Sequence, residues 1–194
     1  MASIARRNLF SDKIRLAITL VGITFAVVLM VGQVGAYLGF MNSASQLIDY
    51  SNVDIWMTAK NTINFDSAKP FPERKINKVK EARGVLWVDK IAQTWGLMKL
   101  KNGGTESVQI IGINPEKDVG IPWKIKAGSI KDLKVGTSIM VDESSLDRLG
   151  GLKVGDEVEI FKKRAKVVGI TEEIKSFTTY PVIFTSYKLS LIHI

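Results

Sequence analysis

The longest uncharged stretch of the chain limits what it can fold into. No Asp, Glu, Lys or Arg occurs from Leu16 to Ile48, and the first part of this stretch is almost entirely apolar. A helix needs about 20 apolar residues to cross roughly 30 Å of hydrocarbon, and the run from Leu16 to Tyr37 meets that length. We therefore predict a transmembrane helix over residues 14–40 that anchors the protein in the lipid bilayer.

The charges that flank this helix predict its orientation. Short flanks rich in Lys and Arg stay in the cytoplasm. The flank before the helix carries the acid Asp12 and a set of basic residues, Arg6, Arg7, Lys13 and Arg15. We expect residues 1–13 to be a cytoplasmic basic segment and the chain after the helix to lie outside. The alternative is a cleaved signal peptide, but its apolar core is shorter, about 7–15 residues, and a small-residue cleavage site follows it.

Small residues recur in the second half of the predicted helix. Gly35 and Gly39 lie four positions apart, as do Gly32 and Ala36, and small residues at this spacing let another helix approach closely. Glycine is also common in membrane helices in general. We expect a helix-packing face here, followed by a stalk over residues 41–52, where helical apolar spacing continues beyond the membrane.

Residues 53–188 are expected to form one extracytoplasmic domain of mixed α and β structure, which makes the fold class α+β. Alternating apolar residues and turn signals predict strands at 53–58, 85–88, 91–100, 107–113, 138–141, 157–161, 165–170 and 182–185. Capping and glycine signals predict helices at 70–83 and 143–149. The segment 117–134 is expected to be a loop.

The last six residues, Leu189 to Ile194, match what the end of a transposase-based sequencing adapter encodes. We expect this segment to be read-through from a library fragment, so that the natural chain continues beyond Lys188. The only histidine, His193, lies in this segment and would then have no function.

The sequence offers no catalytic, cofactor-binding or metal-binding set. It contains no Cys, no phosphate-binding loop, no G-x-S-x-G elbow and no H-E-x-x-H motif. The run Asp142 to Ser145 carries acidic and hydroxyl side chains, but we interpret Asp142 as a helix cap. A membrane-anchored Ser–Lys hydrolase is the one enzyme alternative.

The densest basic group lies between two expected strands and consists of Lys162, Lys163, Arg164 and Lys166. We interpret it as a solvated hairpin turn. A patch for anionic lipid or glycan is the alternative, and no nucleic acid partner is expected outside the cell.

Several segments together resemble the MacB/FtsX-type ABC transporter permeases, and the DevC-like branch most of all. The segment A-R-R-N-L-F-S-D-K-I-R-L-A-I-T-L-V-G-I-T-F-A-V-V-L resembles the first membrane helix of these permeases, and Q-L-I-D-Y-S-N-V-D-I-W resembles the stalk and first strand. Further segments resemble the periplasmic core domain: V-Q-I-I-G-I-N-P (108–115), I-M-V-D-E-S-S-L-D-R-L-G (139–150), K-V-G-D-E-V-E-I-F (153–161), V-V-G-I (167–170) and Y-P-V-I-F-T-S (180–186).

The resemblance implies an export system in the bacterial inner membrane. Such permeases have one N-terminal helix, a large MacB-like periplasmic domain and three further helices. A separate ABC ATPase subunit hydrolyses ATP, two permease copies form a homodimer, and the stalks transmit motion to a periplasmic adaptor (membrane fusion) protein. The permease itself is then not an enzyme. The substrate, whether glycolipid, lipoprotein, peptide or small amphiphile, is not indicated.

Two other functions stay open at this point. The chain could be a single-pass membrane-anchored interaction domain with no transport role. It could also be a lipoprotein-release or cell-division relative within the same superfamily. Three further hydrophobic segments downstream would favour the permease over the anchored domain, and a neighbouring adaptor gene would favour efflux.

Overall fold

The computed structural model describes residues 6, 10–117, 119–176 and 178–191, and the chain divides into two compact units, Met1–Asn42 and Ser43–Ile194. Arg7, one of the residues expected to set the topology, lies outside the described residues, as does the end of the suspected read-through with His193. The expected α+β class, with an N-terminal apolar helix followed by a mixed domain, is confirmed.

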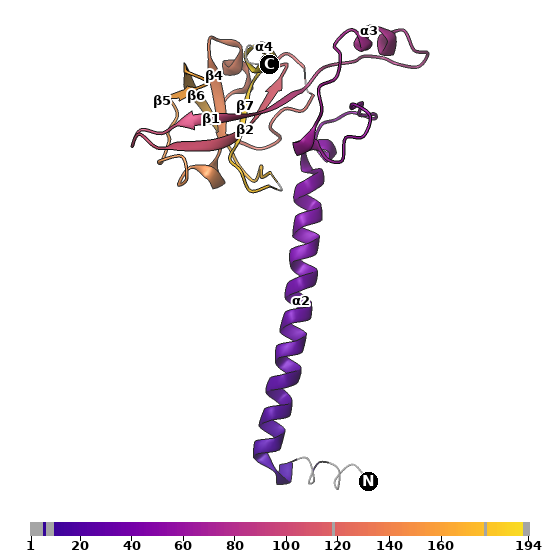
Figure 1. The fold of residues 1–194 in the computed structure, drawn as a ribbon, viewed down its shortest axis with the longest axis vertical. Coiled ribbons are helices and arrows are strands. Elements are labelled where there is room, and N and C mark those ends of the chain that lie inside the picture. The colour runs from indigo at the N-terminus through magenta and orange to yellow at the C-terminus, as the bar shows by residue number, and fades with distance from the viewer. Residues whose placement is uncertain (1–5, 7–9, 118, 177, 192–194) are drawn as a thin grey trace. The chain divides into compact units, whose positions relative to one another are not determined.

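Helix α2 runs without a break over Lys13–Asp49, 37 residues (Figure 1). Its first turn is capped by Asp12, whose Oδ1 accepts a hydrogen bond from the Arg15 backbone N–H at 3.0 Å. At 1.5 Å per residue the helix is about 55 Å long. It is long and apolar enough to cross a membrane, as judged by length and composition.

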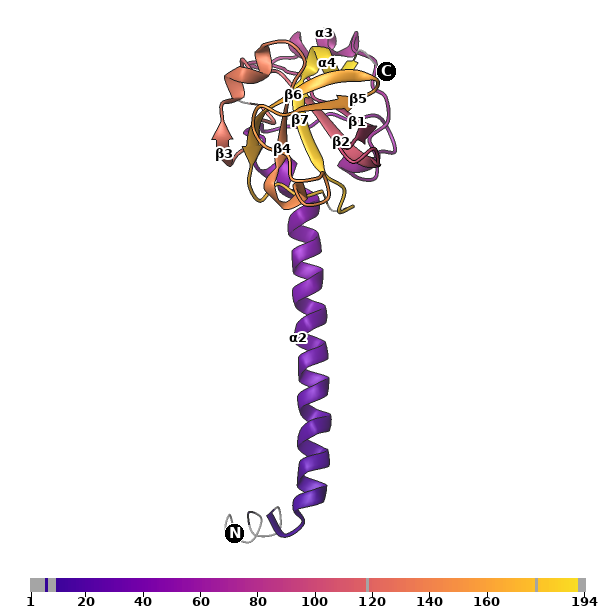
Figure 2. The same cartoon turned by 90° about the vertical axis from the view of Figure 1, so that its left-hand side faces the viewer.

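The strands of the second unit form one seven-stranded sheet that closes into a barrel. Their order is β3-β6-β4-β7-β2-β1-β5, and β5 also pairs with β6 (Figures 1 and 2). The strands are β1 (Ala92–Lys99), β2 (Thr105–Ile113), β3 (Ile125–Gly128), β4 (Ser138–Asp142), β5 (Glu157–Ile160), β6 (Lys163–Thr171) and β7 (Val182–Ser186). β2–β7 and β4–β6 are parallel pairs, and the other pairs are antiparallel. Closure leaves few free strand edges.

Two tight hairpins set the register of the barrel. β1 and β2 pair from Ala92↔Gly112 to Lys99↔Thr105. β5 and β6 are joined by Phe161 and Lys162, which both have positive φ values of 51° and 62°. Two consecutive left-handed residues are typical of the turn whose twist matches that of paired strands. The expected hairpin is therefore confirmed, although Lys163 and Arg164 belong to β6 rather than to the turn.

The strands bury side chains on both faces, because successive residues of a strand point in opposite directions. One cluster fills the barrel and draws on all six closed strands; it includes Met98, Val108, Ile110, Val141, Val158, Val167 and Ile183. The other cluster covers the outer face of β2, β4 and β7 and includes Ile111, Ile113, Met140, Val182 and Phe184. We call this second group the outer cluster.

Several expected elements are absent or shorter in the structure. The predictions of strands at 53–58 and 85–88 were wrong, because no neighbouring strand pairs with either segment and both are irregular. The helix expected at 70–83 is reduced to α3 (Lys75–Lys80), and that expected at 143–149 to the 3-10 turn η3 (Glu143–Ser145). The expected loop 117–134 contains β3 and η2 (Ile130–Lys134). A short helix η1 (Phe65–Ser67) was not predicted. The described chain ends with α4 (Tyr187–Leu191).

Candidate functional site at the helix–domain junction

The last turns of α2, from Ser43 onward, belong to the second unit and pack on the barrel. Leu47 contacts the outer cluster. Tyr50 stacks on Trp123, with ring centroids 4.6 Å apart and planes inclined by 12°. These two side chains fix the end of the helix against the segment that leads into β3.

Local hydrogen bonds explain why the helix ends where it does. The hydroxyl of Ser51 donates to the Ile48 carbonyl at 2.6 Å, which satisfies one of the carbonyls left free at a helix end. The indole N–H of Trp56 then donates to the Ser51 hydroxyl at 2.9 Å. Asn52 has φ +56°, a left-handed conformation that commonly turns the chain away from a helix axis.

A buried carboxylate, Asp66, ties three separate segments together beside this helix end. The side chain of Asn64 caps η1 and so positions Asp66 on its first turn. Asp66 Oδ1 accepts a hydrogen bond from Gln109 Nε2 of β2, and Oδ2 accepts one from the Ser176 hydroxyl at 2.7 Å. Its backbone carbonyl accepts from the Trp95 indole N–H at 3.2 Å. The segment after α2 is thus bonded to β1, β2 and the approach to β7.

A small cavity of about 30 Å³ lies at this junction, lined by Gln46, Leu47, Asp66, Trp123 and Ser176 among others. Drug-sized ligands need about 300–1,000 Å³, so the cavity is not a binding pocket for such molecules. Gln46 Oε1 is buried there and has no hydrogen-bond partner among the described residues. An unpaired buried acceptor costs about 1–3 kcal/mol.

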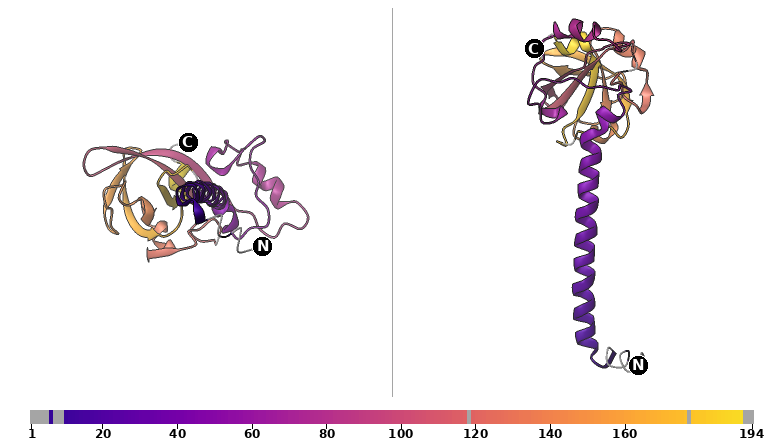
Figure 3. Two further views of the ribbon diagram at one scale, coloured as in Figure 1. Left: turned by 90° about the horizontal axis from the view of Figure 1, so that it is seen from below. Right: turned by 90° about the vertical axis from the view of Figure 1, so that its right-hand side faces the viewer.

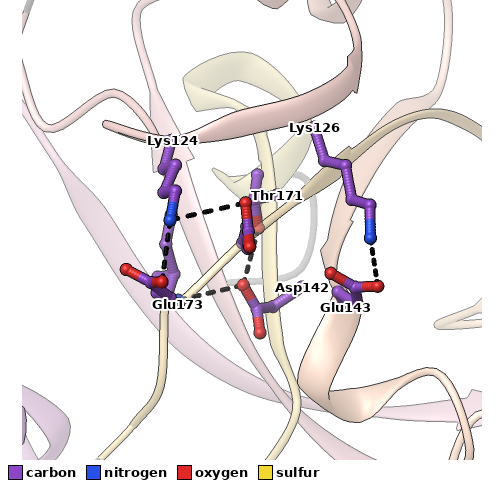
Figure 4. Close-up of polar contacts among 8 residues, drawn as sticks. Lys124, Lys126, Asp142, Glu143, Thr171 and Glu173 are labelled. Carbon is purple, nitrogen blue, oxygen red and sulfur yellow. Dashed lines mark hydrogen bonds and ion pairs between the residues drawn. The ribbon is translucent and has the colours of Figure 1, made fainter.

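A second polar cluster lies at the ends of β4 and β6 (Figure 4). Asp142 is fully buried. Its carboxylate accepts from the Thr171 hydroxyl at 3.1 Å and the Ile174 backbone N–H at 2.9 Å. It also accepts from the backbone N–H and hydroxyl of Ser144 at 3.0 and 2.5 Å. The interpretation of Asp142 as a cap is confirmed, since it caps η3.

The lysines near Asp142 are paired with glutamates and do not act on Ser144. Lys124 lies 2.7 Å from Glu173, and Lys126 pairs with Glu143 (Figure 4). The hydrogen bond to Glu173 raises the pKa of Lys124, and the one to Glu143 raises the pKa of Lys126. A lysine that activates a serine needs a lowered pKa. The geometry therefore gives no support to the Ser–Lys hydrolase, and the described residues contain no group of three His, Cys, Asp or Glu that could hold a metal ion.

The residues predicted to form the helix-packing face lie on α2 and belong to neither cluster. Gly32, Gly35 and Gly39 have open space where a Cβ would stand. The helix-packing face therefore stays a prediction, as does the role of Arg6, Lys13 and Arg15, which are exposed.

Sequence reasoning missed Asp66, Gln109 and Ser176. They come from segments 43 and 110 positions apart, and no local pattern joins them. The one available signal was the single amide of Gln109 inside the apolar run of β2, because a buried polar side chain needs a partner.

Comparison with known proteins identifies the family. The model of the MacB-like periplasmic core domain matches residues 16–194. Two curated relatives from Mycobacterium tuberculosis, strains CDC 1551 / Oshkosh and ATCC 25618 / H37Rv, are described as uncharacterized ABC transporter permeases. Each is 26% identical over 183 residues, which cover 93% of this chain and 49% of the relative. The chain thus spans about half the length of the curated relatives it matches.

Two solved structures are also similar. The periplasmic region of MacB from Actinobacillus actinomycetemcomitans is 15% identical, with 62% of this chain and 57% of that chain covered and a TM-score of 0.45. The extracellular domain of the noncanonic ABC-type transporter YknZ from Gram-positive bacteria is 17% identical, with 70% and 72% covered and a TM-score of 0.46. The family match confirms the resemblance to MacB/FtsX-type permeases, while the placement in the DevC-like branch stays a prediction. Because the matched model extends over residues 16–194, this protein belongs to the family of the MacB-like periplasmic core domain.

Proposed function

We propose that this chain belongs to the permease subunit of an ABC-type export system and transmits ATPase-driven motion to its core domain. The observation that carries the proposal is the continuity of α2. One helix contains the whole apolar stretch and ends in turns that pack on the outer cluster through Leu47. Rigid packed elements with two arrangements are the means by which movement passes between distant sites.

The connection between helix and barrel has the properties of a stiff joint. No glycine or proline occurs between Phe40 and Lys69. The Tyr50–Trp123 stack and the Trp56–Ser51 hydrogen bond hold the helix end, and Asp66 bonds the following segment to the sheet. A movement of the last turns of α2 would therefore reach β2 directly. The unpaired Gln46 oxygen is compatible with a second arrangement of this joint in which it finds a partner.

In this proposal the core domain lies in the periplasm and the N-terminus in the cytoplasm of the bacterial inner membrane. ATP is hydrolysed by a separate subunit, and the moving core domain engages a periplasmic adaptor protein. A second permease copy packs against the face formed by Gly32, Gly35, Ala36 and Gly39. Residues 14–40 span the membrane, 41–52 form the stalk and 53–188 form the core domain, with 189–194 as adapter read-through.

A proline in the stalk tests the transmission step. Asn42 is exposed on α2, and Asn42→Pro removes one helix hydrogen bond and kinks the helix, whereas Asn42→Ala keeps it intact. In the intact transporter, with its ATPase and adaptor, we expect Asn42→Pro to abolish ATP-dependent export while Asn42→Ala exports normally. Equal export by both variants would refute transmission through the helix. It would favour a membrane-anchored interaction domain.

Cysteine labelling tests the orientation, because the chain contains no Cys. Val135 is 73% exposed on the barrel and Phe10 is 55% exposed before α2. In spheroplasts, a membrane-impermeant maleimide should label Val135→Cys, and should label Phe10→Cys only after lysis. The reverse pattern would place the core domain in the cytoplasm.

A further inference from the structure

The segment before β1 carries a group of cations that form no ion pair among the described residues, although Lys75 lies over the Phe71 ring with its Nζ 5.0 Å from the centroid. We call residues 69–90 the basic arm. Five cations lie exposed within ten residues of it and form no ion pair with any carboxylate that the structure describes: Arg74, Lys75, Lys78, Lys80 and Arg83. The nearest acid of the arm, Glu81, is exposed. The other two acids of the arm are paired, Glu73 with Lys90 and Asp89 with Lys117.

Several cations of the barrel form ion pairs, whereas the five cations of the basic arm form none with a described carboxylate. Most of those on β1, β3 and the turns around them face a carboxylate: Lys99 with Glu159, Lys101 with Asp156, Lys126 with Glu143, and Arg148 with Glu106. Other cations of the barrel, among them Lys131, Lys153, Lys162 and Lys163, also lack an ion pair among the described residues, but the basic arm concentrates five such cations within ten residues. Such a local excess of positive charge attracts an acidic partner.

Exposed apolar side chains accompany these cations. Leu86 is 94% exposed and Trp87 is 49% exposed. Tryptophan is one of the residues that most often supply binding energy at protein interfaces. An apolar pair beside a basic group offers a partner both burial and charge complementarity.

The basic arm is held at its base. Lys90 bonds to Glu73 and lies over the ring of Tyr187, with its Nζ 4.7 Å from the ring centroid. The bond to Glu73 raises the pKa of Lys90 and so favours the charged form of its ammonium group. Figures 1 and 3 show α3 at the outer end of this segment, projecting away from the barrel. The basic arm is thus attached to the domain by contacts at Lys90.

We propose that the basic arm is a docking surface for an acidic protein segment that carries an apolar side chain, which packs against Leu86 and Trp87. A second copy of this chain fits poorly, because its net charge is +8. A lipid surface also fits poorly. A helix that lies on a membrane surface turns its apolar face toward the lipid. In α3 the apolar residues Ile76 and Val79 are half-buried, and only the basic face is exposed.

The inference rests on the proposed function in one respect, that the core domain meets an extracytoplasmic protein. Its test needs neither ATP nor transport, so its failure is distinguishable from a failure of the export proposal. The full chain, held in phosphatidylcholine nanodiscs, is titrated with a fluorescent helical peptide of glutamates and leucines. A peptide with each glutamate replaced by glutamine serves as the uncharged probe. We expect binding of the acidic peptide only, weakened by added salt.

Variants then locate the binding. Arg74→Glu/Lys78→Glu/Arg83→Glu should weaken binding about ten-fold, through the loss of several exposed charge pairs. The matched control, Lys162→Glu/Lys163→Glu/Arg164→Glu on the β5–β6 hairpin, makes the same change of charge and should bind as the parent does. Leu86→Ser should also weaken binding, whereas Val135→Ser, at another exposed apolar site, should not.

Three outcomes would overturn the proposal. The acidic peptide does not bind the parent chain at low salt, or both triple variants lose affinity equally, which would show a general charge effect. The third outcome combines two results. The parent chain in nanodiscs floats with phosphatidylglycerol vesicles while the arm variant does not, and the parent chain does not bind the acidic peptide. That last result would assign the surface to anionic lipid.

Discussion

The carboxylate of Asp66 accepts a hydrogen bond from the hydroxyl of Ser176 at 2.7 Å, across 110 positions of sequence. The other oxygen of the same carboxylate accepts from the amide of Gln109 on β2. One buried acid therefore joins the segment that follows α2 to β2 and to the approach to β7.

Removal of the Asp66 carboxylate should destabilise the domain. In Asp66→Ala the buried donors of Gln109 and Ser176 lose their acceptor, at a cost of about 3 kcal/mol. Asp66→Asn should cost only about 1 kcal/mol, because its amide oxygen can still accept from Gln109 and the serine hydroxyl can turn to accept. Asp54→Ala, at an exposed acid, is the control and should be near neutral. Thermal unfolding of the full chain in detergent, followed by circular dichroism, ranks the stabilities of these variants. An Asp66→Ala protein as stable as Asp54→Ala would contradict it.

Replacement of Gln46 by an apolar residue should stabilise the folded protein. Its Oε1 is buried without a partner in the described structure, and Met has a similar length with no acceptor to desolvate. We expect Gln46→Met to raise the unfolding free energy by about 1 kcal/mol and, if the oxygen finds its partner in a second state, to lower export. A stabilised variant with full export would show that the unpaired oxygen has no part in the transport cycle.

Two glycines with similar backbone conformations should respond differently to alanine. Gly128 (φ +85°) ends β3, where an added Cβ would lie 2.1 Å from the Val168 carbonyl oxygen. Gly136 (φ +61°) has open space around it. Gly136→Ala should cost about 1 kcal/mol, from its left-handed backbone alone. Gly128→Ala should cost more than about 3 kcal/mol, because the pairing of β3 with β6 must shift. Equal losses in urea unfolding would show that β3 adjusts without strain.

Asp156 should make stability depend on pH on the acid side. The hydrogen bond from Lys101, and next that from the Lys153 backbone N–H, hold the pKa of its carboxyl below the ordinary value of 3.8. A lowered pKa contributes stability that is complete above that ordinary value and is lost as the pH falls through the folded-state pKa. The gap in unfolding temperature between the parent and Asp156→Asn should therefore be constant near neutral pH and close on acidification. When Lys101 is replaced by Met, the difference in unfolding temperature that Asp156→Asn makes should become smaller. A difference that does not change with pH would refute the assignment.

Local patterns in the sequence determined the parts of this protein that depend on neighbours along the chain. The uncharged apolar run predicted α2, because a helix satisfies all its backbone groups within itself. Alternating apolar residues predicted β1, β2, β4 and β7 close to their true bounds, and the turn before Lys163 was placed within two residues.

The tertiary structure decided what depends on distant partners. Residues 53–58 alternate as a strand does, yet no strand of the sheet pairs with them in the folded chain. Asp66, Gln109 and Ser176 meet only because three segments fold onto one another. The absence of ion pairs for the five cations of the basic arm likewise shows only once the positions of the described carboxylates are known. Hydrogen bonds and ion pairs between residues far apart in sequence have no local signature, since their energy depends on distances that the folded chain alone sets.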